Sequence, residues 1–217
     1  MPRFHPNLLL EMRALAEGHR YIAGVDEAGR GPLAGPVVAA AVILPLGRGA
    51  GWLHLPRDSK QLTAQQREEV FAVITSEALS YGVGAASAAQ IDALGIVPAT
   101  RLAMMTAIAE LRLQPNFVLV DAVRLPDLKA PHDAVIKGDD LSVSIAAASI
   151  VAKVVRDRQM VELDRLYPGY GFARHKGYPT EAHLKAMAEL GPCPEHRRSF
   201  RPVAEVMGDE EMERGEP

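Results

Sequence analysis

The sequence contains one cysteine, Cys193, among 217 residues, and no apolar run long enough to cross a membrane. A single cysteine excludes an internal disulfide and any zinc site built from several thiolates. Without an apolar run of about 18 residues, or a basic start followed by an apolar core, the chain is expected to be soluble and cytoplasmic. Hydrophobic residues make up 48% and charged residues 24%, which is ordinary globular usage and excludes a disordered or fibrous protein.

The net charge is −3, but acidic residues concentrate at the C-terminal end. Residues 208–217 hold five acids and one arginine, a net charge of −4, which leaves +1 for residues 1–207. We therefore expect a single folded domain, residues 1–207, followed by a disordered acidic tail, residues 208–217. Basic residues gather late in the domain, within residues 153–201, where they form either a solvated surface or one that faces phosphates.

Hydrophobic periodicity and end signals predict the order of strands and helices. Short apolar, β-rich runs predict strands at residues 21–25, 37–44, 79–85, 117–120 and 134–136. Amphipathic patterns predict helices at residues 8–16, 63–78, 141–166 and 181–190, and one that starts near Pro98 and ends before Pro115. This order indicates an α/β or α+β layer fold with a mixed sheet.

Carboxylates follow three of the predicted strands. Asp26 and Glu27 end the first strand, Asp121 follows the fourth directly and Asp139 comes shortly after the fifth. A carboxylate beside a buried strand must be paired, hydrogen-bonded or bound to a metal, because a lone buried charge is costly. The four acids could therefore meet at one sheet edge, although any one of them could instead be a helix cap or a turn residue.

An oxygen-only cluster of this kind suits Mg²⁺ or Mn²⁺ better than Zn²⁺. Two such ions about 4 Å apart can activate water and stabilise the leaving oxygen of a phosphodiester, so phosphoryl transfer is the expected chemistry. Neighbours in a regular strand point to opposite faces, so Glu27 can join Asp26 only if the chain turns at Ala28 and Gly29.

Three further segments could bind a sugar-phosphate backbone. Gly29-Arg30-Gly31 offers close backbone approach and one guanidinium, although a plain glycine-rich turn has the same composition. Lys60 could place an ammonium on a phosphate or form a loop salt bridge. Aromatic residues alternate with cations in residues 167–180, where they could stack on sugars or bases or fill the core beneath them.

Together these segments closely resemble bacterial ribonuclease HII. The matching motifs are Gly24-Val25-Asp26-Glu27-Ala28-Gly29-Arg30-Gly31-Pro32, Asp58-Ser59-Lys60, Leu119-Val120-Asp121, Lys137-Gly138-Asp139, residues 148–154, His175-Lys176-Gly177-Tyr178 and His196-Arg197-Arg198-Ser199-Phe200. The resemblance spans residues 22–203, and its motifs are specific in combination. It implies a ribonuclease H-like fold, in which helices flank a mixed five-stranded sheet and a helical part is added at the C-terminus.

The resemblance also implies an activity and a cofactor. The chain would be an endonuclease that cuts the RNA strand of RNA–DNA hybrids and cuts at ribonucleotides embedded in duplex DNA, using Mg²⁺ or Mn²⁺. Attack by water would leave 3′-hydroxyl and 5′-phosphate ends. No membrane partner is expected, and the protein is expected to be a monomer.

Position by position, the resemblance assigns roles to residues of this chain. It implies that the catalytic and metal-binding acids are Asp26, Glu27, Asp121 and Asp139. It implies that substrate is bound by Gly29, Arg30 and Gly31 at the ribose 2′-hydroxyl, by Tyr178 at the neighbouring sugar, and by Lys60, Ser149 and Lys153 near the backbone. The chain departs from the family pattern at Asp140, which could exchange roles with Asp139, and at Ala122, which stands where glycine is frequent.

The four acids alone also allow other functions. A junction resolvase or another metal-dependent nuclease would need the same carboxylates, and only the Gly29-Arg30-Gly31 loop with Tyr178 favours reading a ribonucleotide. An inactive nucleic-acid binding module would not need the acids, yet all four are present. A phosphatase with a covalent aspartyl intermediate is disfavoured, because no second aspartate stands two residues after Asp26.

Overall fold

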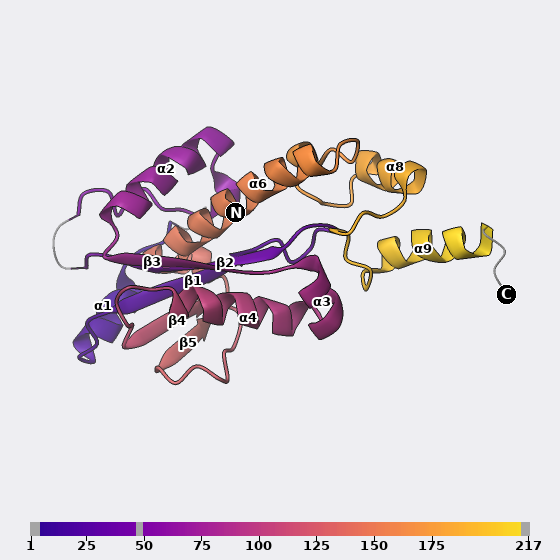
Figure 1. The fold of residues 1–217 in the computed structure, drawn as a ribbon. Coiled ribbons are helices and arrows are strands. Elements are labelled where there is room, and N and C mark those ends of the chain that lie inside the picture. Colours follow the sequence, from indigo (N-terminus) through magenta and orange to yellow (C-terminus); the bar gives the residue numbers. More distant parts are fainter. Residues whose placement is uncertain (1–4, 47–49, 214–217) are drawn as a thin grey trace.

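The computed structural model describes residues 5–46 and 50–213, with side chains up to residue 208. Its centre is a five-stranded sheet in the order β3-β2-β1-β4-β5 (Figure 1). The strands are β1 (Ile22–Ala28), β2 (Val37–Ile43), β3 (Ser80–Ala86), β4 (Phe117–Asp121) and β5 (His132–Val135). The pairs β1–β2 and β2–β3 are antiparallel, whereas β1–β4 and β4–β5 are parallel. The sheet is therefore mixed, as predicted.

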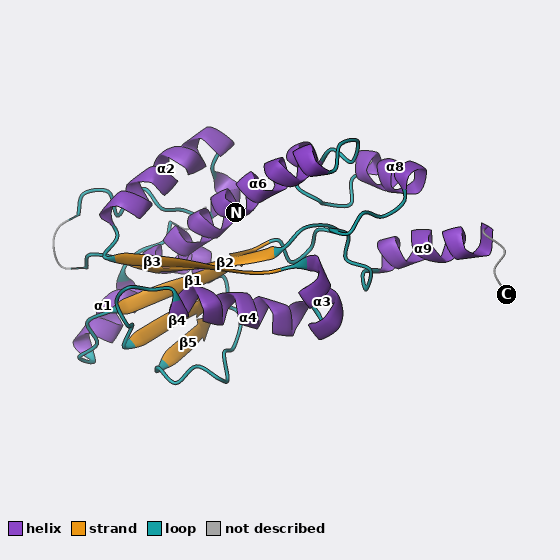
Figure 2. Cartoon of the chain, viewed as in Figure 1, coloured by secondary structure: helices purple, strands orange, loops and turns teal. Residues whose placement is uncertain are grey.

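Helices cover both faces of this sheet. The helices are α1 (Leu9–Ala16), α2 (Ala64–Glu77), α3 (Ala88–Leu94), α4 (Ile96–Ala109), α5 (Gly138–Leu141), α6 (Val143–Leu166), α7 (Phe172–His175), α8 (Glu181–Leu190) and α9 (Arg201–Glu213), with a short 3-10 helix at Ser59–Gln61. Figure 2 shows α2 and α6 on one side of the sheet, α3 and α4 on the other, and α8 and α9 beyond one end of it. The layers are those of a ribonuclease H-like fold with an added C-terminal helical part.

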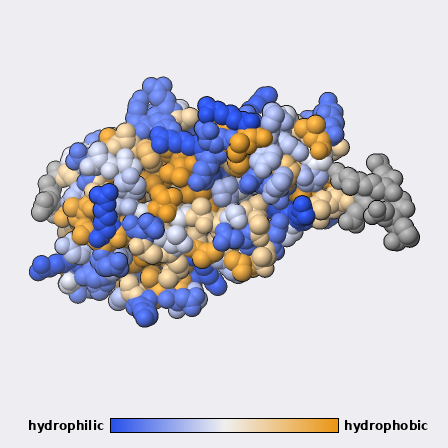
Figure 3. All heavy atoms as spheres, viewed as in Figure 1, coloured by the Kyte–Doolittle hydropathy of each residue, from blue (hydrophilic) through white to orange (hydrophobic). Residues whose placement is uncertain are grey.

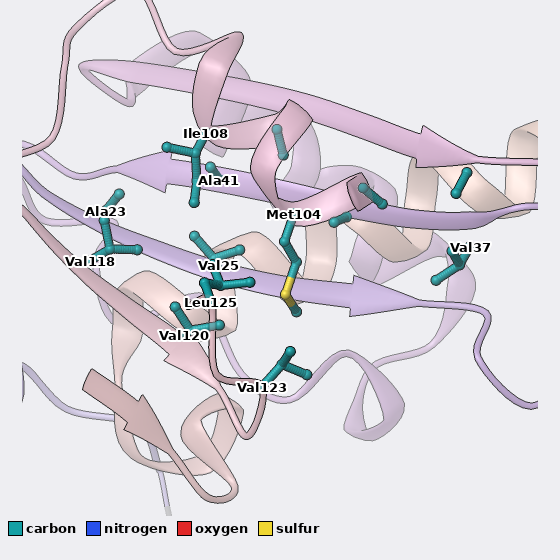
Figure 4. Close-up of a cluster of buried hydrophobic side chains, with 14 of the residues drawn as sticks. Ala23, Val25, Val37, Ala41, Met104, Ile108, Val118, Val120, Val123 and Leu125 are labelled. Atoms are coloured by element: carbon teal, nitrogen blue, oxygen red, sulfur yellow. The ribbon is translucent and has the colours of Figure 1, made fainter. Parts of the chain in front are cut away.

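The central strand β1 divides its side chains between the two layers. Ala23 and Val25 belong to the apolar cluster under α4, with Met104 of that helix (Figure 4). Because side chains alternate along a strand, Gly24 and Asp26 face the opposite layer, which contains α6. A Cβ atom at Gly24 would overlap the backbone of Ser144, so α6 lies directly on β1. This close approach places the buried half of α6 beside Asp26.

The N-terminus of α6 is held by a buried carboxylate from α1. Glu11 is fully buried, and its Oε1 accepts hydrogen bonds from the Ser142 hydroxyl (2.6 Å) and the Ser144 N–H (2.9 Å). The negative charge lies at the positive end of the helix dipole, and the bonds satisfy donors that no helix can satisfy internally. The position of α6 is therefore fixed at its first turn as well as along β1.

The predicted strands and helices are present, and the differences are shifted element ends and short helices that were not predicted. The predicted helix at 141–166 begins at Val143, because Ser142 accepts a hydrogen bond from Ile145 N–H and caps it. The predicted strand at 134–136 is β5, His132–Val135. Helix α3 was not predicted, although Ser87 and Gln90 form a capping box at its start.

The acidic tail predicted from residue 208 overlaps the end of α9, since residues 208–213 continue this helix. Val203, in the first turns of α9, is buried against Met187 of α8 and Leu33. Packing of the early turns offsets the nucleation cost, so the helix can continue beyond them. Residues 214–217 of the predicted tail lie outside the described residues.

The described surface mixes polar and apolar residues. Figure 3 shows hydrophobic residues in separate patches between hydrophilic ones on the viewed face. Within the described residues, no helix combines the length and apolar character that a membrane span requires.

A chain of hydrogen-bonded histidines crosses the C-terminal part. His196 Nδ1 accepts from Cys193 N–H (3.0 Å), the two Nε2 atoms of His196 and His183 lie 3.1 Å apart, and His183 Nδ1 lies 2.9 Å from the Tyr178 carbonyl. A backbone N–H only donates and a carbonyl only accepts, so His196 carries its proton on Nε2 and His183 on Nδ1. Both rings are buried and neutral.

This histidine chain predicts a loss of stability in mild acid. Burial lowers the pKa of His183 and lowers the pKa of His196 to about 4, whereas an unfolded histidine titrates near 6.5. Between these values the unfolded chain binds more protons, so the free energy of unfolding falls as the pH drops from about 6.5 to about 4, by up to about 1.4 kcal/mol per pH unit and proton.

Urea unfolding at a series of pH values measures this slope. Replacement of the buried ring in His196→Gln should flatten the slope in this window, whereas His54→Gln, which changes an exposed histidine, should leave it unchanged. An identical slope in the wild type and His196→Gln would contradict the assignment.

Candidate active site

One cavity of about 220 Å³ lies where β1 and β4 end side by side. Its lining includes every site residue that the sequence predicted: Asp26, Glu27, Gly29, Arg30, Gly31, Lys60, Asp121, Asp139, Ser149, Lys153 and Tyr178. Ala28 and Ser59 complete the lining. Residues separated by up to about 150 positions in the sequence are thus brought to one place.

Asp26 and Glu27 reach the cavity from the end of β1. Asp26 is 5% exposed, and its Oδ1 accepts the Glu27 N–H at 2.7 Å. β1 stays paired with β2 through Ala28, and Gly29, with φ +95°, follows the end of the strand. Glu27, which follows Asp26 directly in β1, lines the same cavity.

Asp121 ends the neighbouring parallel strand β4, and Asp139 lies in the short helix α5 that follows β5. Val25 of β1 pairs with Val120 of β4 in the sheet. Asp26 is the residue after Val25, and Asp121 is the residue after Val120. Asp121 Oδ1 accepts the Gly138 N–H at 2.7 Å, which links the end of β4 to the turn that carries Asp139. Asp139, 7% exposed, lines the cavity.

Asp140 lies outside the lining of this cavity. Its Oδ1 accepts a hydrogen bond from Gln61 Nε2 at 3.2 Å. The cavity lining thus contains Asp139 and not Asp140. The other departure, Ala122, has φ 47°, a left-handed conformation that costs a residue with a Cβ atom about 1–2 kcal/mol and explains why glycine suits this position.

The acids experience burial and mutual repulsion. Burial, and after it the carboxylates of Glu27 and Asp121, raises the pKa of Asp26 well above its ordinary value. Burial is also the largest cause that raises the pKa of Glu27, Asp121 and Asp139. These carboxylates therefore lack sufficient positive charge around them.

Two cations lie against the acids from the cavity rim. Arg30 Nη1 is 3.2 Å from Glu27 Oε1, and Lys60 Nζ is 3.5 Å from Asp139 Oδ2. The Lys60 side chain is 80% exposed, so water screens its charge. Lys153, in contrast, pairs with Asp157 on its own helix at 2.6 Å, so its ammonium is held away from the acids.

The donor set fits a hard divalent cation. The Oε2 atom of Glu27 is buried without a hydrogen-bond partner, and the acidic group contains only oxygen donors. Within residues 5–46 and 50–213, no three His, Cys, Asp or Glu side chains already stand close enough together to hold a metal ion. The acids surround the cavity without converging, and a cation at this place would supply the positive charge that they lack.

The glycine loop and Tyr178 form opposing walls of the cavity. A Cβ atom at Gly31 would lie 3.8 Å from Tyr178 Cε1, with no other atom within 4 Å. Gly29 is required for a different reason, because its φ is positive and a Cβ atom there would overlap the side chain of Arg156. Tyr178 is 45% exposed and lines the same cavity as the loop.

Sequence reasoning missed the roles of Arg156 and Arg197. Both belong to basic clusters that were expected on a solvated or phosphate-facing surface, but their side chains are 1% and 0% exposed. Arg156 donates to the carbonyls of Ala34, Pro36 and Lys176. Nothing in a single sequence distinguishes such a buried arginine from a surface one.

Comparisons with known proteins identify the family of the chain. The family model for ribonuclease HII matches residues 23–203. The ribonuclease HII of Citrifermentans bemidjiense is 56% identical over 200 residues, which cover 91% of this chain and 85% of that protein. That of Chloroflexus aggregans is 50% identical over 204 residues, 93% of this chain and 96% of that protein.

A solved structure shows the same fold. The crystal structure of ribonuclease H2 from Pyrococcus horikoshii aligns with a TM-score of 0.75 at 28% identity, covering 91% of this chain and all of that one. The match of the family model and the identity to curated relatives extend over nearly the whole domain. The chain belongs to the ribonuclease HII family: it is a metal-dependent ribonuclease H, an endonuclease that acts on the RNA of RNA–DNA hybrids.

Proposed function

We propose that this enzyme also cleaves at single ribonucleotides embedded in duplex DNA, and that Asp26, Glu27, Asp121 and Asp139 hold Mg²⁺ or Mn²⁺ for the reaction. The observation that carries the proposal is the single cavity lined by these acids, by the Gly29–Gly31 loop and by Tyr178. Family membership argues against the junction resolvase that the four acids alone allowed. We also propose that the enzyme works as a monomer in the cytoplasm.

Divalent cations in such a site activate water and neutralise charge on the phosphodiester. The chain's own contribution begins with the buried carboxylates, which select hard cations and fix where they bind. Ser149 lies at the cavity floor, where its hydroxyl donates to Ser59 at 3.0 Å, and Lys60 stands at the rim. We assign the substrate backbone to this side of the cavity, where Lys60 can exchange its contact with Asp139 for one with a phosphate.

The ribose is read on the other side of the cavity. The 2′-hydroxyl is the one group that distinguishes a ribonucleotide from its DNA neighbours. The loop around Gly31 lets backbone N–H groups approach that hydroxyl, and Tyr178 can pack against the adjoining sugar from the facing wall. Because water, and not the 2′-hydroxyl, attacks the phosphorus, the products carry 3′-hydroxyl and 5′-phosphate ends.

The first prediction concerns the metal. Cleavage of a labelled duplex that contains one ribonucleotide should stop in excess EDTA and return when Mg²⁺ or Mn²⁺ is added in excess of the chelator. Ca²⁺ should bind but support little turnover, since its flexible coordination misplaces the attacking water. Full activity in excess EDTA would overturn the assignment of the acids to metal binding.

The second prediction separates Asp139 from its neighbour. Asp139→Asn should reduce kcat severely, because it removes a buried carboxylate from the cavity, whereas Asp140→Asn should have a mild effect. Single-turnover rates with matched circular dichroism spectra measure both variants. If Asp140→Asn were the inactive variant, the assignment of these adjacent residues would be reversed.

The third prediction concerns Tyr178. Tyr178→Ala should slow cleavage at a single embedded ribonucleotide strongly, by up to about a hundredfold, because the phosphodiester to be cut is no longer held in a fixed position relative to the four acids. Long RNA–DNA hybrids should suffer less, since they offer alternative registers. Tyr178→Phe keeps the ring and serves as the matched control, with both rates near those of the wild type. Equal losses on both substrates for Tyr178→Ala would remove the proposed role.

A further inference from the structure

Arg197 is a fully buried arginine beneath the glycine loop. It follows α8 in the chain, and its side chain is 0% exposed. Its guanidinium donates to the carbonyls of Gly29 (2.6 Å), Arg30 (2.9 Å) and Gly35 (3.0 and 2.9 Å), and among the described residues it forms no ion pair with a carboxylate. A buried charge without a counter-ion is costly, so these carbonyl dipoles provide its solvation.

The hydrogen bonds of Arg197 determine which way the loop's N–H groups point. No described peptide bond is cis, and in a trans peptide the C=O and the following N–H point in opposite directions. The Gly29 and Arg30 carbonyls point to the buried guanidinium, so the N–H groups of Arg30 and Gly31 point away from it, on the side of the cavity that these residues line. Neither N–H has a partner among the described hydrogen bonds.

The guanidinium also adds positive charge behind these two donors. Burial lowers the pKa of Arg197 to about 9, which leaves the group protonated at neutral pH. A second buried arginine, Arg156, lies under Gly29 and donates to the Lys176 carbonyl, two residues before Tyr178. The ring of Phe200 packs on the Arg197 guanidinium, with 5.1 Å between the Cζ atom and the ring centroid. Contacts on several sides thus hold the planar guanidinium group of Arg197 in place.

We propose that Arg197 is a positioning residue that directs the N–H groups of Arg30 and Gly31 at the ribonucleotide to be cut. The inference rests on the proposed cleavage at embedded ribonucleotides and names a residue that acts through the loop, without touching the substrate. Lysine cannot replace it. A single ammonium keeps the charge but cannot reproduce the planar fork, whose Nε, Nη1 and Nη2 atoms together reach three carbonyl groups.

The experiment compares Arg197→Lys with Arg198→Lys, which makes the same change at the exposed neighbouring position. The readout is the ratio of two dissociation constants in Ca²⁺, for an all-DNA duplex and for the same duplex with one ribonucleotide. Wild type and Arg198→Lys should both prefer the ribonucleotide. Arg197→Lys should lose about tenfold of that preference, the effect of misplacing one or two hydrogen-bond donors.

A purely structural role would give a different result. A destabilised but correctly shaped enzyme has a smaller active fraction, which lowers binding amplitudes and leaves the ratio of constants unchanged. An unchanged ratio in folded Arg197→Lys therefore overturns the proposal. If Arg197→Lys does not fold, Phe200→Leu is tested instead, because it keeps the arginine but removes the ring that packs on its guanidinium. An unchanged ratio of dissociation constants in Phe200→Leu would then overturn the proposal.

The proposed function fails separately. If the wild type does not prefer the ribonucleotide and does not cleave at it with Mg²⁺, the proposed substrate is wrong and the inference falls with it. If the wild type prefers and cleaves it but Arg197→Lys retains that preference, only the positioning role is lost.

Discussion

The proposed active site depends on four carboxylates that line one small cavity at the end of β1 and β4. Asp26 is buried close to Glu27 and Asp121, and among the described residues the nearby cations pair with other acids, Arg30 with Glu27 and Lys60 with Asp139. Such an arrangement is unfavourable in isolation, because desolvation and like-charge repulsion both oppose ionisation. The close packing of α6 on Gly24 and the capping of α6 by Glu11 keep the acids in place despite that cost.

The C-terminal part is structurally part of this site. Arg197, which follows α8, organises the carbonyls of the glycine loop, and the His196–His183 chain ends on the carbonyl of Tyr178. Arg156 of α6 connects the two, since it donates both to Ala34 after the loop and to Lys176 before Tyr178. The glycine loop and Tyr178, to which we assign the ribose, are therefore held from behind by buried polar groups that donate mainly to backbone carbonyls.

The sequence predicted the parts of the structure that carry local signals. Apolar runs followed by acids located β1, β4 and their carboxylates, and Thr63 with Gln66 located the start of α2. The burial of Arg156 and Arg197 could not be predicted, because a charged residue normally marks a surface and only the folded chain brings the carbonyls that solvate it. The pairing of Lys153 with Asp157 is an i, i+4 contact within α6, which the sequence spacing permits.

The most direct test of carboxylate crowding is the melting temperature of the wild type and Asp26→Asn, each measured free of metal and in Mg²⁺. If repulsion among the acids is the central constraint, Asp26→Asn should melt about 2–4 °C higher than the wild type without metal, since it removes a charge that the folded site disfavours. Mg²⁺ should then raise the melting temperature of the wild type and have little effect on the variant. A lower melting temperature for metal-free Asp26→Asn, together with an equal response of both proteins to Mg²⁺, would contradict the account.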